Sequence, residues 1–160
     1  MKSMNNTRLY LVQHGEAVSE TINPDRPLTE KGRLDSARTA GFLKTSGMTV
    51  DVIWHSSKTR ARETAAIFQN ELLSKEGIVQ KEGFSPNDPV GPVFDEIGHA
   101  QKNIMIVGHL PFLQKLASLA LINSEAYEII KFSMGGVVCL ERNEEGKWQL
   151  IFEIIPELLR

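Results

Sequence analysis

The apolar residues of this chain occur in short runs that alternate with longer stretches of helical spacing. Residues 9–12, 52–54 and 104–107 are brief apolar runs without polar alternation, a pattern typical of strands buried on both faces. Between and after them, apolar residues recur three and four positions apart, as on one face of a helix. This spacing predicts helices over residues 30–45, 58–74 and 111–122, and a weaker one over 92–100.

The last third of the chain has a different pattern. Residues 137–140 and 148–155 resemble strands, and the turn-rich segment 143–146 joins them as a hairpin. In the second strand, period-two alternation predicts one shared face for the apolar side chains Trp148, Leu150, Phe152 and Ile154. Strand–helix repeats followed by a hairpin favour an α/β three-layer sandwich with a mostly parallel central sheet and an antiparallel C-terminal hairpin. Because the chain has no internal repeat and no low-complexity linker, we expect one domain over residues 1–160.

Composition narrows the class of protein. The net charge of −2 gives no long-range attraction to nucleic acid or to an anionic membrane surface, so neither is expected as a partner. No apolar stretch approaches the ~20 residues of a membrane span, and no signal-type apolar region precedes the first strand. A cytoplasmic protein is therefore expected. The single cysteine, Cys139, excludes an internal disulfide, and its apolar neighbours predict a buried residue.

Polar segments follow three of the predicted strands directly. These segments are residues 13–15, 55–57 and 108–109. In sheets of this kind, ligands bind beyond the carboxyl ends of the parallel strands. The sequence therefore predicts that the three segments meet at one rim of the sheet.

The side chains at this rim suit a phosphoryl group. His14 and His109 both follow predicted strands: one imidazole can attack phosphorus, and the other can donate a hydrogen bond to an oxygen. The guanidinium of Arg60 can bind two further oxygens in its planar fork. Each of these residues alone has an ordinary structural explanation, so the prediction depends on their convergence.

Other chemistries fit less well. A zinc site made by His14, His109 and a carboxylate lacks the usual ligand spacing. The chain has no glycine-rich nucleotide loop and no Gly-x-Ser-x-Gly elbow. We therefore expect no metal and no cofactor. Ser56 and Ser57 are predicted to cap the following helix, and His55 fits either the pocket wall or a structural role.

Four segments resemble the histidine phosphatase superfamily in content and order. They are residues 11–16, 26–32, 56–65 and 107–109. The short chain and the Arg-Pro-Leu-Thr segment look most like SixA-type phosphohistidine phosphatases. The resemblance implies a phosphoglycerate mutase-like fold in which His14 is phosphorylated, Arg60 binds the phosphate, His109 completes the pocket and Arg26 reaches it from its loop. It also implies a metal-independent enzyme of signal transduction, acting on a phosphorylated protein domain of the histidine-containing phosphotransfer type.

One residue departs from the family pattern. The superfamily motif is usually Arg-His-Gly, and Gln13 stands here in place of that arginine. Glutamine keeps a neutral N–H donor for the substrate but supplies no charge, and Arg26 is the candidate that compensates. Two alternatives remain beside the phosphohistidine phosphatase. One is a small-molecule phosphomonoesterase, and the other, motivated by Gln13, is a weakly active or inactive phosphate-binding regulatory module. The general acid is open between Asp88 and Glu16, with a turn or helix-cap role favoured for Asp88.

Overall fold

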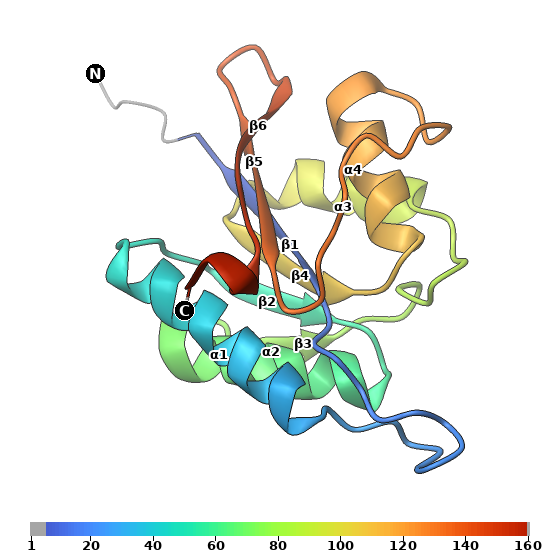
Figure 1. The fold of residues 1–160 in the computed structure, drawn as a ribbon. Helices are drawn as coiled ribbons and strands as arrows, with labels where there is room; N and C mark the ends of the chain where they lie inside the picture. The colour runs from blue at the N-terminus through green and yellow to red at the C-terminus, as the bar shows by residue number, and fades with distance from the viewer. Residues whose placement is uncertain (1–5, 160) are drawn as a thin grey trace.

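Within residues 6–159, the part of the chain that this computed structural model describes, six strands form one sheet with the order β3-β2-β4-β1-β5-β6 (Figure 1). The expectation for the segment before the first strand falls largely on residues 1–5, which lie outside the described part. The elements are β1 Arg8–Gln13, α1 Glu30–Thr45, β2 Val52–His55, α2 Thr59–Leu72, β3 Ile78–Gln80, α3 Gly91–Ala100, β4 Ile104–Gly108, α4 Phe112–Ile122, β5 Val137–Arg142, β6 Trp148–Ile154 and a 3-10 helix, η1, at Pro156–Leu159.

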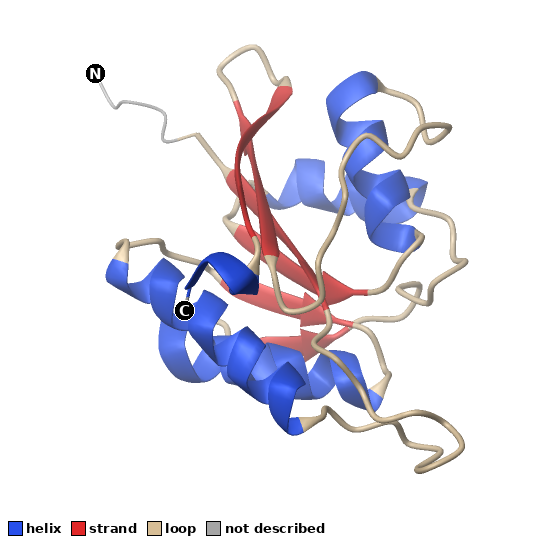
Figure 2. Ribbon diagram, in the orientation of Figure 1, coloured by secondary structure: helices blue, strands red, loops and turns tan. Residues whose placement is uncertain are grey.

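The sheet is mostly parallel with an antiparallel margin. β4 lies between β1 and β2 and is parallel to both, and β2 is also parallel to β3. β5 is antiparallel to both β1 and β6. Helices α1 and α2 cover one face, and α3 and α4 cover the other (Figures 1 and 2). The predicted three-layer α/β fold with a C-terminal hairpin is therefore confirmed.

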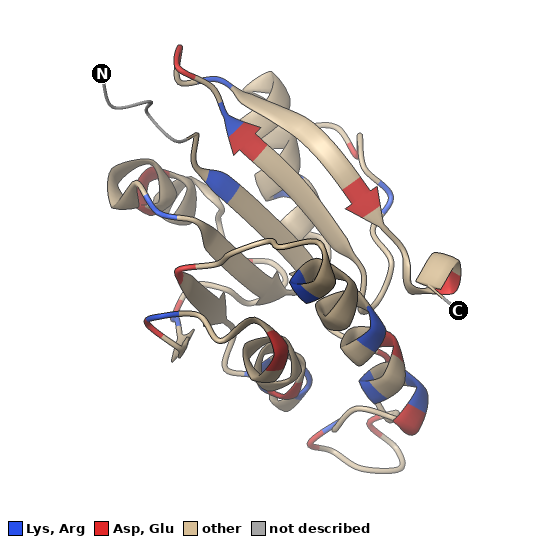
Figure 3. Ribbon diagram, turned by 90° about the vertical axis from the view of Figure 1, so that its left-hand side faces the viewer, with Lys and Arg blue, Asp and Glu red and all other residues tan. Residues whose placement is uncertain are grey.

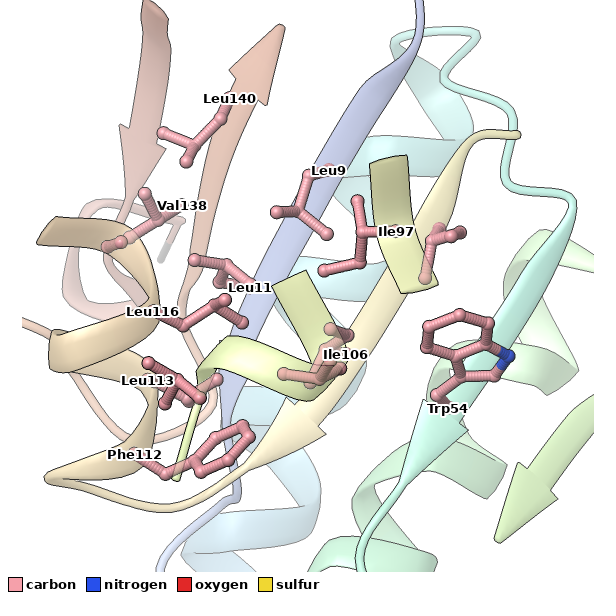
Figure 4. Packing of buried hydrophobic residues seen from close by; sticks show 14 of the residues in the cluster. Leu9, Leu11, Trp54, Ile97, Ile106, Phe112, Leu113, Leu116, Val138 and Leu140 are labelled. Atoms are coloured by element: carbon pink, nitrogen blue, oxygen red, sulfur yellow. The ribbon is translucent and has the colours of Figure 1, made fainter. Parts of the chain in front are cut away.

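The central strands are buried on both faces, as their unbroken apolar runs predict. Leu9 and Leu11 of β1 pack against residues of α3 and α4, and Figure 4 shows this layer from close by. Tyr10 and Val12 point to the opposite layer, which contains residues of α1 and α2. Cys139 is buried in this second layer, as expected.

The prediction of one apolar face for β6 is wrong. The pairing of β5 with β6 shifts between Cys139 and Leu140, so that Phe152 lies opposite Cys139 and Leu150 lies opposite Leu140. The extra residue, Ile151, reverses the side to which the following residues point. As a result Trp148 packs in the layer of α3 and α4, whereas Phe152 and Ile154 pack in the layer of α1 and α2.

Strand β3 was not predicted from the sequence. It has three residues, all of them exposed, and it forms an edge of the sheet beside β2. A segment this short carries no periodicity, so only its pairing with β2 identifies it as a strand.

The basic residues Lys31, Arg38 and Lys44 of α1 are exposed, whereas Asp35 is buried. Lys31 and Arg38 pair with Asp35 at 2.6 Å and 3.4 Å, and Lys44 pairs with Glu71 of α2 at 3.7 Å. Figure 3 shows basic and acidic positions interspersed along the helices. A surface pair such as Lys44 with Glu71 contributes up to about 1 kcal/mol to stability. Among the described helices, none has the length and apolar character that crossing a membrane requires.

Candidate active site

The carboxyl ends of β1, β2 and β4 bring the predicted segments together. The backbone N–H of His14 donates to the carbonyl of Gly108 at 3.0 Å, which ties the residue after β1 to the end of β4. The imidazole rings of His14 and His109 lie side by side, with centroids 5.1 Å apart, and both residues are buried. Arg60 reaches the same place from the first turn of α2. The predicted convergence of His14, His109 and Arg60 is therefore observed.

The hydrogen bonds of His14 define which nitrogen carries its proton. Nδ1 lies 2.7 Å from the carbonyl oxygen of Gly15, and because a carbonyl only accepts, Nδ1 must donate. The lone pair is then on Nε2, and the Nε–H of Arg60 donates to it at 3.3 Å. Burial, and then the charges of Arg60 and Arg26, lower the pKa of His14 to about 4. His14 is therefore neutral near pH 7, with its lone pair on Nε2.

His109 is held by a residue of the neighbouring strand end. Its Nε2 lies 2.6 Å from the hydroxyl oxygen of Ser56, which follows β2. Its Nδ1 is buried and has no hydrogen-bond partner among the described residues. Burial, followed by the charges of His14 and Arg60, lowers the pKa of His109 to about 3.

Arg60 also lines a cleft that holds more cations than carboxylates. Arg26, Lys58 and Arg60 line it together with the carboxylate residues Glu20 and Asp25. Burial and the charge of Arg26 lower the pKa of Arg60 from its ordinary value. Arg26 thus shares the cleft with Arg60, and Lys58 is a further cation there that the sequence did not single out.

The loop that carries Arg26 is anchored at its base. Ala17 and Leu28 form an isolated antiparallel bridge, and the N–H of Val18 donates to the carbonyl of Pro27 at 2.8 Å. The Nε–H of Arg26 donates to the carbonyl of Val18 at 3.1 Å. Leu28 N–H donates to the carboxylate of Glu63 on α2 at 2.8 Å. The two sides of the loop are therefore joined at its base, and the base is fixed to α2.

Two glycines allow the motif segments to cross at close range. A Cβ on Gly32 would lie 2.2 Å from the carbonyl oxygen of Glu16, and a Cβ on Gly15 would lie 2.8 Å from that of Gly32. Thr29 caps α1, as predicted, by accepting from the N–H of Gly32 at 3.0 Å. Its hydroxyl donates to the carboxylate of Glu16 at 2.7 Å. The carboxylate of Glu16 is thus engaged at the start of α1.

Thr64 is a site residue that sequence reasoning missed. Its hydroxyl donates to the carbonyl of Arg60 at 2.8 Å and accepts from the N–H of Gly15 at 2.9 Å. The threonine therefore links the turn that carries His14 to the helix that carries Arg60. Its position one helical turn after Arg60, inside a recognised motif, was the available signal.

Several other candidates have structural roles. Asp88 accepts from the N–H of Ser85 at 2.8 Å, which is the favoured turn role. Within residues 6–159, no hydrogen bond joins Asp88, Glu16 or the side chain of Gln13 to the two site histidines or to Arg60. The buried His55 bonds through Nδ1 to the carbonyl of Ser56 at 2.8 Å.

The prediction that a serine caps α2 is wrong. The N-cap residue is Lys58, which makes no side-chain capping bond. Ser56 instead accepts from the N–H of Lys58 at 3.3 Å and holds His109. In the described part of the chain, no group of three or more His, Cys, Asp or Glu is arranged to hold a metal ion.

We expect the protein to lose stability as the pH falls from 7.5 to 5. His14 and His109 have folded-state pKa values of about 4 and about 3, below the ordinary 6.5 that applies to the unfolded chain. Between these values the unfolded chain binds protons that the folded chain does not, so the free energy of unfolding decreases. The loss at pH 5 is on the order of 2 kcal/mol for each histidine.

Urea unfolding at the two pH values measures this loss. A His109→Gln variant should lose less stability between them than the native chain does, whereas His99→Gln, at an exposed position on α3, should behave like the native chain. Equal losses of unfolding free energy in all three proteins would contradict the attribution of part of the loss to His109.

Comparisons with known proteins find similarity in sequence pattern and in fold. Residues 9–84 match the sequence model of the histidine phosphatase superfamily (branch 1), and no curated protein sequence matches the chain. The structure of the protein histidine phosphatase SixA complexed with tungstate superposes with a TM-score of 0.85 at 19% identity, over 96% of this chain and 100% of that one.

Two further phosphatases have a similar fold. A mutant of Entamoeba histolytica phosphoserine phosphatase in complex with phosphoserine has a TM-score of 0.72 at 18% identity, over 96% of this chain and 100% of that one. A mycobacterial glucosyl-3-phosphoglycerate phosphatase with bound vanadate has a TM-score of 0.71 at 13% identity, over 91% and 98% of the two chains. The chain thus combines the sequence pattern of the histidine phosphatase superfamily over residues 9–84 with the phosphoglycerate mutase-like fold of SixA, which confirms its resemblance to that superfamily.

Proposed function

We propose that this chain is a phosphatase in which His14 accepts the phosphoryl group. The observation that carries the proposal is the state of the His14 ring. Gly15 binds its Nδ1–H, and the Nε2 lone pair lies 3.3 Å from the guanidinium of Arg60. A neutral imidazole with a fixed lone pair beside an arginine has the arrangement that nucleophilic attack on a phosphoryl group requires.

The reaction then has two steps. In the first, an Nε2–phosphorus bond forms on His14 as the bond from phosphorus to the leaving group breaks. In the second, water attacks the phosphorus, the nitrogen–phosphorus bond breaks, and inorganic phosphate leaves with His14 restored. Arg60 binds two phosphoryl oxygens, and His109 donates to an oxygen of the same group. Arg26 and Arg60 supply the positive charge, so the proposal includes no metal ion.

The substrate that we propose is phosphohistidine on a protein domain of the histidine-containing phosphotransfer type. An imidazole leaves phosphorus more readily than an alkoxide does, so this substrate makes the weakest demand for a general acid. That matches a site whose two candidate acids, Glu16 and Asp88, are bound to Thr29 and to the backbone of Ser85. The fold similarity to SixA supports the same choice.

A small phosphate ester is the second candidate substrate. It is favoured by the similar folds of the phosphoserine and glucosyl-3-phosphoglycerate phosphatases. The deciding experiment compares kcat/KM for a phosphotransfer domain phosphorylated on its histidine, for phosphoserine and for glucosyl-3-phosphoglycerate. We expect the phosphorylated domain to be hydrolysed with the highest kcat/KM. Faster hydrolysis of either ester would assign the chain to the small-molecule class.

A phosphate-binding module without useful catalysis is the third candidate, and Gln13 motivates it. Losing one charged donor at a transition state costs on the order of 10²–10³ in rate. If the native chain binds tungstate but hydrolyses none of the three substrates, and Gln13→Arg creates activity, the binding module is the better description. Measurable hydrolysis by the native chain excludes it.

A further inference from the structure

We propose that Ser56 is a positioning residue that fixes His109 in the tautomer with its proton on Nδ1. The consequence for phosphoryl transfer rests on the function proposed above, whereas the tautomer itself can be measured without it. Ser56 was predicted from the sequence as a helix cap, and the structure gives it a different partner.

The pairing of β2 with β4 places Ser56 next to His109. β2 and β4 pair in parallel with His55 opposite Val107, so the segments that follow the two strands leave the sheet next to each other. The Ser56 hydroxyl oxygen and the His109 Nε2 are 2.6 Å apart, and the two residues are each only 2% exposed. Water therefore has little access to replace this hydrogen bond.

Counting hydrogens decides which atom donates. The Ser56 oxygen accepts from the N–H of Lys58 at 3.3 Å, and its single proton has His109 Nε2 as its acceptor among the described residues. If Nε2 donated instead, the Ser56 proton and the Nδ1 lone pair would both be buried without a partner. Because buried polar groups without partners are costly, the arrangement with fewer of them is favoured: Ser56 donates and Nδ1 carries the proton.

In this tautomer the imidazole of His109 has one N–H donor, Nδ1–H, without a partner among the described residues. The Nδ1–H of His109 has no acceptor among the described residues, and its ring lies 5.1 Å from that of His14. Phosphoryl oxygens are acceptors only, so a substrate supplies what this N–H lacks. The two imidazoles are then held in the same tautomer but used through opposite nitrogens. A carbonyl holds His14 so that it presents a lone pair, and a hydroxyl holds His109 so that it presents a proton.

The tautomer is tested by two-bond ¹H–¹⁵N NMR of the histidine rings at pH 8, without substrate. We expect His109 to be protonated on Nδ1 in the native chain and to lose this fixed state in Ser56→Ala. His14 and His55, which donate from Nδ1 to the backbone carbonyls of Gly15 and Ser56, serve as internal controls and should not change. Protonation of native His109 on Nε2 would overturn the proposal, and this measurement needs no variant to fold.

Tungstate affinity and kinetics test the role of the contact. Ser56→Ala should weaken tungstate binding, and lower kcat/KM for the best substrate, about tenfold or more, because a donor to an anion is no longer fixed. Ser56→Thr keeps the hydroxyl and should restore most of both. Ser118→Ala removes a hydroxyl that is equally buried but lies on α4, and should change neither.

Each outcome bears on one of the two proposals. Unchanged His109 tautomer and unchanged tungstate affinity in Ser56→Ala would overturn the positioning role. If the native chain hydrolyses no phosphorylated substrate while the NMR result is as expected, the proposed function fails and the positioning of His109 stands.

Discussion

His14→Ala is expected to abolish phosphatase turnover and the covalent intermediate. The variant removes the only atom to which the proposed reaction transfers the phosphoryl group, so kcat should fall on the order of 10⁴-fold or more. The backbone of residue 14, which donates to the carbonyl of Gly108, is unchanged by the substitution, so the strand ends should stay in place. Loss of activity in a folded protein is therefore the expected result.

The intermediate is measured by mass spectrometry of the native chain, quenched at alkaline pH during turnover. Phosphate should be found on His14 and be missing from the alanine variant. His99→Ala removes an exposed histidine of α3 and should keep full activity. Turnover by His14→Ala, or phosphate on another residue of an active native chain, would disprove the mechanism.

Arg60→Ala is expected to cause the second-largest loss, on the order of 10²–10³-fold in kcat/KM. The guanidinium is the charged donor at His14 Nε2, and in the proposed reaction it binds the oxygens on which charge develops. Arg60→Lys should recover only part of the loss, since an ammonium group lacks the planar pair of donors. The comparison is made by steady-state kinetics on the best substrate.

The same variant should change the acid limb of the pH profile. The charge of Arg60 is one of the causes that lower the pKa of His14, so its removal raises that pKa and moves the loss of activity in acid to higher pH. Arg62→Ala, on the exposed side of the same helix turn, is the matched control and should change neither quantity. An Arg60→Ala enzyme within about twofold of the native rate would contradict the role of Arg60.

The layered fold was predictable because its central strands are buried on both sides. Burial on two faces leaves an unbroken apolar run, as at residues 9–12, and the ends of such runs located His14 and His109 correctly. The predicted helix over residues 30–45 has the same bounds as the observed α1. Its start was predictable because Thr29 is a typical capping residue and caps the helix through its side chain.

The features that the sequence did not predict depend on contacts between segments that are distant in the chain. The bulge in β6 is a register shift against β5, and alternation within one strand contains no information about its partner. The sequence around Ser56 predicts only a helix cap. Its observed partner, His109, follows a different strand and is distant in the sequence. The effect of Gln13 on the rate of the proposed reaction was likewise not predictable from its sequence neighbours. It depends on the positive charge that Arg26 and Arg60, from other segments, supply to the phosphoryl group.

The anchored base of the 17–28 loop separates two parts of the molecule that can change independently. The bridge between Ala17 and Leu28 and the bond from Leu28 to Glu63 close the loop before it reaches its tip at residues 19–25. Insertions, deletions or new side chains at that tip, where Ile22 is 79% exposed, leave the histidines and their supports untouched. Grafting a different tip can thus redirect the proposed phosphoryl transfer to another substrate at little cost to the fold.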